Sequence, residues 1–195
     1  MVRTGTLLMW IAITVICATA YGVVNDQITS TISTEYFSVY KFRQFTPQLE
    51  MFGMIDAPMR VQAILIGTLA TWWYGLFLGI MLGISSMAGR HAPLTTMQYM
   101  RIIGAVMVFT FAISVIFGTF AYIIEPFTKP DAANMPFLES IQNIRNAYCV
   151  GSWHNGSYLA ALVATVYASF WAQAKRRKIA LAERNKNSED QLFQF

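Results

Sequence analysis

Residues 61–89 read VQAILIGTLATWWYGLFLGIMLGISSMAG and contain no Asp, Glu, Lys or Arg. A helix rises ~1.5 Å per residue, so ~20 apolar residues cross the ~30 Å hydrocarbon layer of a membrane. Three further stretches, residues 4–24, 102–124 and 149–174, also lack these charged residues. The sequence therefore predicts an all-α integral membrane protein, with residues 1–195 forming one domain built as a bundle of four transmembrane helices.

The composition and the charge distribution support this class. Hydrophobic residues make up 55% of the chain and charged residues 12%, against roughly 25% charged in a typical soluble domain. Six of the 14 Lys and Arg residues lie in the tail at 175–195, directly after the fourth stretch. A basic cluster in that place is typical of contact with lipid headgroups. We therefore expect the net charge of +4 to favour the lipid bilayer as a partner, and not nucleic acid.

The basic residues also predict an orientation. The N-terminus, the loop after the second stretch and the tail together carry nine Lys and Arg residues, while the two longer loops at 25–60 and 125–148 carry five. Lys and Arg near the ends of spans favour the cytoplasmic side. Both termini should thus be cytoplasmic, with the two longer loops on the other side of the membrane. The small residues Ala18 and Ala20 leave open a cleaved signal peptide, although an uncharged run of 21 residues favours an uncleaved helix.

Small residues recur at every fourth position in two of the stretches. The second stretch has Gly75, Gly79 and Gly83, and the fourth has Gly156, Ala160, Ala164 and Ala168. Helices in a membrane associate through close backbone approach, which small side chains permit. The pattern predicts that these two faces pack on each other within one chain. The alternative is a seam between copies in a homo-oligomer, or a pore lined by the glycines.

The two longer loops carry weaker signals of structure. Residues 28–40 are rich in β-branched and aromatic residues that alternate with polar ones, which predicts a short β-like segment. In the second long loop, Asn134 predicts the cap of a short amphipathic helix. Its apolar face would hold Phe137, Leu138, Ile141, Ile144 and Tyr148.

Polar residues gather at the predicted outer ends of the spans, where they should converge in one layer. They are Asp26, Gln27, Glu35, Glu125 and His154. Carboxylates and a histidine can bind a divalent metal, with Asp26, Glu35 and His154 as candidate ligands, or form an acid–base pair. The favoured interpretation is that these groups form ion pairs and helix caps, and that the chain holds no metal or other cofactor.

Other chemistries lack their motifs. Cys17 and Cys149 are the only cysteines, and there is no Cys-x-x-Cys pair for redox chemistry. The chain has neither a glycine-rich phosphate-binding loop nor a Gly-x-Ser-x-Gly nucleophile elbow. These absences leave the polar residues at the span ends as the candidate site.

Several short islands resemble an uncharacterised family of four-span bacterial membrane proteins. The islands are Tyr21-Gly22, Asp26-Gln27-Ile28-Thr29, Glu35-Tyr36-Phe37, Thr71-Trp72-Trp73, His154 and Ser157-Tyr158. The resemblance implies a multi-pass protein of the bacterial inner membrane and no established activity. It also implies that relatives often carry His in place of Asn25 and another His near Lys41, so this chain would lack two potential metal ligands.

Two functions are compatible with these features. The first is a non-catalytic accessory or assembly subunit that docks a membrane-protein partner, or a second copy, through its outer loops. The second is a small membrane enzyme, or a solute or ion pathway, with a cavity that reaches from His154 toward Trp72 and Trp73. The sequence favours the first, because the predicted spans contain no ionisable residue deep enough for a proton or ion relay.

Overall fold

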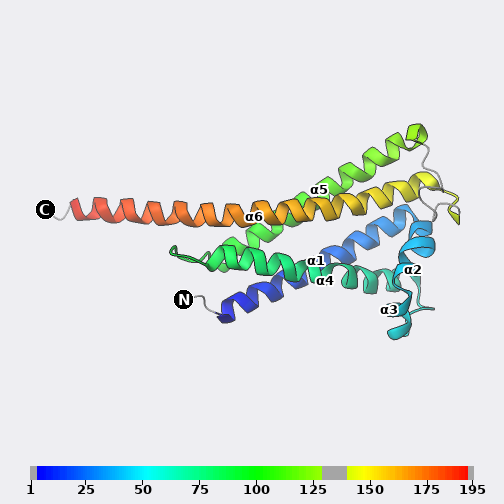
Figure 1. The fold of residues 1–195 in the computed structure, drawn as a ribbon, viewed down its shortest axis with the longest axis horizontal. Helices are drawn as coiled ribbons and strands as arrows, with labels where there is room; N and C mark the ends of the chain where they lie inside the picture. Colours follow the sequence, from blue (N-terminus) through cyan, green and yellow to red (C-terminus); the bar gives the residue numbers. More distant parts are fainter. Residues whose placement is uncertain (1–3, 129–139, 193–195) are drawn as a thin grey trace.

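The computed structural model describes residues 4–128 and 140–192, and this part of the chain is helical throughout its regular elements. Four long helices run side by side (Figure 1). They are α1 (Thr4–Ile32), α4 (Met59–Met87), α5 (Thr96–Thr128) and α6 (Ile144–Leu192). Short helices, η1 (Tyr36–Lys41), α2 (Phe42–Gln44) and α3 (Thr46–Met51), lie at the end of the bundle where α1 ends. We call this the η1 end, and the opposite end, beyond which α6 extends, the tail end.

Three helices, α1, α4 and α5, are long and apolar enough to cross a membrane. This agrees with the predicted all-α membrane protein. The predicted fourth span, residues 149–174, lies inside α6 but does not meet the same condition in the described chain. Its uncharged run is less apolar because it includes polar residues such as His154, Asn155 and Gln173.

The predicted β-like segment at 28–40 is wrong. Its first residues complete α1, and Tyr36–Lys41 form the single π-helical turn η1; the described residues contain no strand. The hydroxyls of Thr29, Ser30 and Thr31 donate to carbonyls three or four residues earlier in α1. Thr29 and Ser30 are also fully buried. Packing of one helix face therefore outweighs the strand preference of the β-branched residues, which depends on context.

The expected amphipathic helix falls partly outside the described residues, since Asn134, Phe137 and Leu138 lie between residues 128 and 140. Ile144 and Tyr148 belong to the long helix α6 and not to a separate short one.

The glycine face of α4 packs on α1, so the predicted partner face on α6 is wrong. A Cβ added at Gly75 would lie 2.7 Å from the Val15 Cα and 2.8 Å from the Ala18 Cβ, both on α1. A Cβ at Gly79 would lie 3.0 Å from the Ile11 Cα. Both helices present small residues here, which lets their backbones approach closely.

The small face of α6 receives larger side chains instead. Ala164 and Ala168 lie in a core cluster with Leu78 and Leu82 of α4 and Ile103 of α5. At the η1 end, a Cβ at Gly156 would lie 2.7 Å from the Phe117 Cβ of α5. The bundle thus consists of two close pairs, α1 with α4 and α5 with α6.

A buried arginine holds α6 at the tail end. Arg176 is only 3% exposed, and its guanidinium donates to five backbone carbonyls at the end of α4 and in the loop that follows. The acceptors are Ser85, Met87, Ala88, His91 and Ala92. A cation at a helix C-terminus also meets the negative end of the helix dipole. One residue of the basic tail, Arg176, is therefore buried against the end of α4 and is not free to contact lipid headgroups.

Replacing Gly75 by Leu should lower the melting temperature in detergent, because the new side chain must push α4 away from α1. Overpacking of this kind usually costs ~1–3 kcal/mol. Gly104→Leu is the matched control, since a Cβ at Gly104 meets nothing within 4 Å. Equal melting temperatures for the two variants would contradict the packing of α4 on α1.

Candidate functional site

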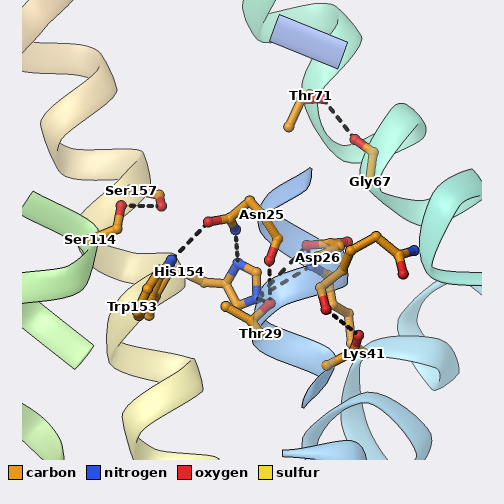
Figure 2. A network of polar contacts seen from close by, with 12 residues as sticks. Asn25, Asp26, Thr29, Lys41, Gly67, Thr71, Ser114, Trp153, His154 and Ser157 are labelled. Atoms are coloured by element: carbon orange, nitrogen blue, oxygen red, sulfur yellow. Dashed lines mark hydrogen bonds and ion pairs between the residues drawn. The ribbon is translucent and has the colours of Figure 1, made fainter. Parts of the chain in front are cut away.

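A group of buried polar side chains lies inside the η1 end of the bundle (Figure 2). Asn25, Asp26 and Thr29 come from α1, Lys41 from η1 and His154 from α6; we call these five residues the Asp26 cluster. Each is at most 5% exposed. A polar group this deeply buried must be hydrogen-bonded or paired, because its desolvation is otherwise not compensated.

Asp26 and Lys41 form a buried ion pair. The Lys41 Nζ donates to the Asp26 Oδ1 at 2.5 Å, and the two side chains are only 6% and 4% exposed. Burial lowers the pKa of the Lys41 ammonium below its ordinary value, and the neighbouring Asp26 carboxylate offsets only part of this effect. The second carboxylate oxygen, Asp26 Oδ2, is buried and has no hydrogen-bond partner among the described residues.

The hydrogen bonds of Asn25 determine which ring nitrogen of His154 carries the proton. The Trp153 indole Nε1–H donates to the Asn25 Oδ1 at 2.8 Å, and an indole can only donate. The Asn25 amide group must then face the His154 Nδ1, 3.4 Å away, and donate to it. Thr29 donates its own proton to the Asn25 carbonyl, so its oxygen accepts from the His154 Nε2 at 3.4 Å. Because Nδ1 accepts, His154 is neutral and carries its proton on Nε2; the Lys41 Nζ, 3.5 Å from the same nitrogen, is then a second donor beside it and not its hydrogen-bond partner.

The π-helical turn η1 closes the cluster from one side. Hydrogen bonds from residue i to i+5 widen a helical turn, and η1 directs Tyr36, Phe37 and Lys41 toward α6. The Tyr36 ring stacks on His154 with centroids 5.7 Å apart, and the Phe37 ring meets it edge-on at 6.2 Å. The Lys41 Nζ also lies 5.0 Å from the Phe37 centroid. Aromatic rings therefore cover the cluster on the side of η1.

The structure brings together only two of the five polar residues predicted to converge. Asp26 Oδ1 lies 3.9 Å from the His154 Nε2. Glu35 instead accepts the backbone N–H groups of Gln142 and Asn143 just before α6, at 3.1 and 2.9 Å.

The remaining two predicted residues also have other partners. Gln27 binds Arg60 of α4, and Glu125 pairs with the half-exposed Arg145 at 3.5 Å. These contacts are the ion pairs and caps of the favoured interpretation. No group of three or more His, Cys, Asp or Glu side chains in the described chain is placed to hold a metal ion. The structure separates the candidate ligand Glu35 from Asp26 and His154.

Three residues of the Asp26 cluster were not among the predicted site residues. Thr29 stands three residues after Asp26 and four after Asn25, so helical spacing was a signal for Thr29. For Asn25 the signal was its position next to Asp26 at the same span end. Lys41 had no comparable signal, because a lysine in a loop is usually exposed.

A cavity of about 580 Å³ adjoins the cluster. Asp26, Lys41 and His154 line one end of it, and Thr14 lines it deeper in the bundle. Along α1 the distance from Asp26 to Thr14 corresponds to ~18 Å of helix rise, so the cavity is elongated along the bundle. Trp73 also lines it, as the second functional hypothesis expected, but Trp72 does not.

The mouth of the cavity lies between α4 and α6. Four of its lining residues are also exposed on the surface of the bundle: Trp73 and Phe77 of α4, and Tyr158 and Leu162 of α6. The lining residues contributed by α1 and α5 are buried, such as Thr14 and Ile103, or half-buried, such as Tyr21 and Met107, and they form the back wall. The opening therefore faces sideways, between two helices.

No family model, curated protein or solved structure matches this chain. Its function is therefore inferred from geometry.

Lys41→Met should strongly destabilise the protein, because it leaves the Asp26 carboxylate buried and unpaired. Removing one partner of a buried ion pair typically costs ~3–5 kcal/mol. Arg145→Met is the control, since its pair with Glu125 is partly exposed and such pairs contribute ~0–1 kcal/mol. Thermal unfolding in detergent measures both. Equal losses would mean that Lys41 and Asp26 are not a buried pair in the folded protein.

Proposed function

We propose that this protein is a multi-pass membrane protein that binds a lipophilic small molecule in the cavity beside the Asp26 cluster. The observation that carries the proposal is one elongated cavity of about 580 Å³ with apolar walls, a buried ion pair at one end and a lateral mouth. Sites for small ligands are commonly cavities of roughly 300–1,000 Å³ with a few convergent polar groups. In this proposal the protein binds the molecule, and Asp26, Lys41 and His154 lie at the end of the cavity that receives its polar head group.

The position of the mouth supports a ligand that arrives from the bilayer. Trp73 and Phe77 lie near the middle of α4, within a helix apolar enough to span a membrane. A ligand entering between α4 and α6 at that level passes through hydrocarbon and not through water. The apolar side chains Phe77, Val106 and Leu162 along the cavity suit a hydrocarbon chain.

We further propose that α6 is the fourth span. Trp153 binds Asn25 at the η1 end, and Arg176 binds the end of α4 at the tail end. Between residues 153 and 176 the helix rises ~34 Å, which matches the ~30 Å hydrocarbon layer. Of the two polar residues that lower its hydropathy near the η1 end, His154 is buried within the bundle, while Asn155 is exposed close to the end of the proposed span.

The proposed location is the bacterial inner membrane, with both termini cytoplasmic and the η1 end on the outer side. The basic residues of the tail support this orientation. Membership of the four-span bacterial family is part of the same proposal. It is supported by the contact of three residues from its islands, Asp26, Tyr36 and His154.

The second candidate is an accessory subunit that docks a membrane-protein partner through its outer loops. The observation that favours it is a set of apolar side chains left exposed in and after α3, where Met51 is 71%, Phe52 50% and Ile55 44% exposed. In this case variants of the cavity would leave the partner bound, while polar replacements of Met51 and Phe52 would release it.

Reporter fusions test the topology. Fusions after Gly89 and after Arg184 should report the cytoplasm, and a fusion after Gln44 should report the outer side, because the positive charges cluster at the tail end. An outer signal after Arg184 together with a cytoplasmic one after Gly89 would contradict the span in α6.

Photoreactive dodecyl probes, carrying a diazirine on the chain and reconstituted with the protein in phosphatidylcholine vesicles, test the cavity. Saturable labelling should map to Trp73 and Phe77 on α4 and to Tyr158 on α6, because these residues surround the mouth. Ala70 lines the cavity, so Ala70→Phe should place a large side chain where the probe binds. The saturable labelling should fall about tenfold or more, which corresponds to a loss of ~1.4 kcal/mol in binding free energy. Ala12→Phe, at an exposed position of α1, should leave it unchanged. Labelling that never saturates with any probe would refute the proposal.

A further inference from the structure

Two buried polar atoms of residues that line the cavity have no hydrogen-bond partner in the described chain. They are the Asp26 Oδ2 and the Thr110 Oγ1. Asp26 is 2% exposed and Thr110 4% exposed, so bulk water does not satisfy them. A buried polar group without a partner costs ~1–3 kcal/mol, and each such group in a folded protein calls for an explanation. A ligand that forms hydrogen bonds to the Asp26 Oδ2 and the Thr110 Oγ1 would explain why both atoms lack a partner in the described chain.

The neighbouring polar groups already have partners. Both ends of the Asn25 amide and both His154 nitrogens are engaged within the cluster. Further along the cavity, the Tyr74 hydroxyl bonds the Ala161 carbonyl and Ser157 bonds Ser114. The head group of a ligand is thus directed to the Asp26 carboxylate. A carboxylate oxygen only accepts hydrogen bonds, so the head group must carry a donor.

The charges of the Asp26 cluster determine whether a neutral, cationic or anionic head group fits best beside Asp26. The Lys41 ammonium and the Asp26 carboxylate cancel, and His154 is neutral in the assigned hydrogen-bond pattern. A cationic head group at Asp26 would lie next to the Lys41 ammonium, and an anionic one would lie against the Asp26 carboxylate. Like charges repel strongly where water is excluded. A neutral donor avoids both penalties.

We infer that the ligand is a neutral amphiphile with a hydroxyl head group, whose hydroxyl donates to the Asp26 Oδ2 while its hydrocarbon chain extends along α1 toward Thr14. A second polar atom below the head group meets the Thr110 Oγ1. This inference rests on the proposed function and names the ligand class of the same cavity. Neutral lipids with free hydroxyls, such as monoacylglycerols, have this chemistry.

The experiment is a competition in phosphatidylcholine vesicles. A photoreactive dodecanol labels the protein, and unlabelled dodecanol, its methyl ether, dodecylamine and dodecanoate compete at matched concentrations in the membrane. The methyl ether keeps the chain and the oxygen but loses the donor. Dodecanol should compete about tenfold better than the ether, which is the loss expected for one hydrogen bond to a charged group. The amine and the carboxylate should compete no better than the ether.

Two variants locate the effect. In the double variant Asp26→Leu with Lys41→Met, which removes both charges together with the acceptor at position 26, the advantage of dodecanol over its ether should disappear. Thr110→Val removes a hydroxyl that has no hydrogen-bond partner among the described residues, so the variant should fold normally. It should weaken competition by monododecanoylglycerol, which has further oxygens, more than competition by dodecanol. If the double variant does not fold, the ratio of alcohol to ether in the unmodified protein still decides the inference.

The outcomes separate the two proposals. Best competition by the amine, the carboxylate or the ether overturns the hydroxyl head group but leaves a lipophilic ligand in the cavity. Equal competition by all four compounds also overturns the head group assignment. Absence of saturable labelling with probes of every head group overturns the proposed function itself.

Discussion

The ion pair between Lys41 and Asp26 is the constraint on which the η1 end depends. A carboxylate at the end of a membrane-spanning helix is costly to bury alone, and the charge that compensates it comes from a separate segment. The loop after α1 must therefore turn back over the bundle, and the π-helical turn η1 places Lys41 within 2.5 Å of the carboxylate. The same turn brings Tyr36 and Phe37 onto His154, so aromatic rings cover the Asp26 cluster on this side.

The cavity follows from how the four long helices pair. Glycines draw α4 against α1, and α6 packs on α5. Each pair is close, but the two pairs meet through larger and less complementary side chains, such as Tyr74 and Met107, which line the cavity. Space therefore remains between the pairs and reaches the Asp26 cluster. A membrane protein has little hydrophobic force to close such a space, because lipid tails are as apolar as its walls.

The sequence predicted the helical class and the small-residue faces because both depend on local composition and helical spacing. It did not predict which faces meet, since Gly75 and Ala164 carry the same packing signal and only the whole bundle decides their partners. It also misassigned 28–40, where buried hydroxyls bond the backbone of α1. Of the candidate site, Asp26 and His154 were recognised as polar residues near span ends. Lys41 was not, because its role depends on a fold of the intervening loop that no local pattern encodes.

Two stacked aromatic rings lie at the deep end of the cavity, and their position bears on whether the proposed function is binding or transport. Beyond Thr14 the interior is filled by Trp10 and Tyr99, which are at most 1% exposed and stack with centroids 4.4 Å apart. Thr14 bonds the Tyr99 hydroxyl at 2.9 Å, and the Trp10 indole donates to Thr96 at 3.3 Å, so these rings are held from both sides. A path through the bundle would have to displace two stacked aromatic rings and break both bonds. In the proposed function, a molecule that enters between α4 and α6 would meet an ion pair at one end and the stacked Trp10 and Tyr99 rings at the other, and this closed end supports our proposal of binding over transport.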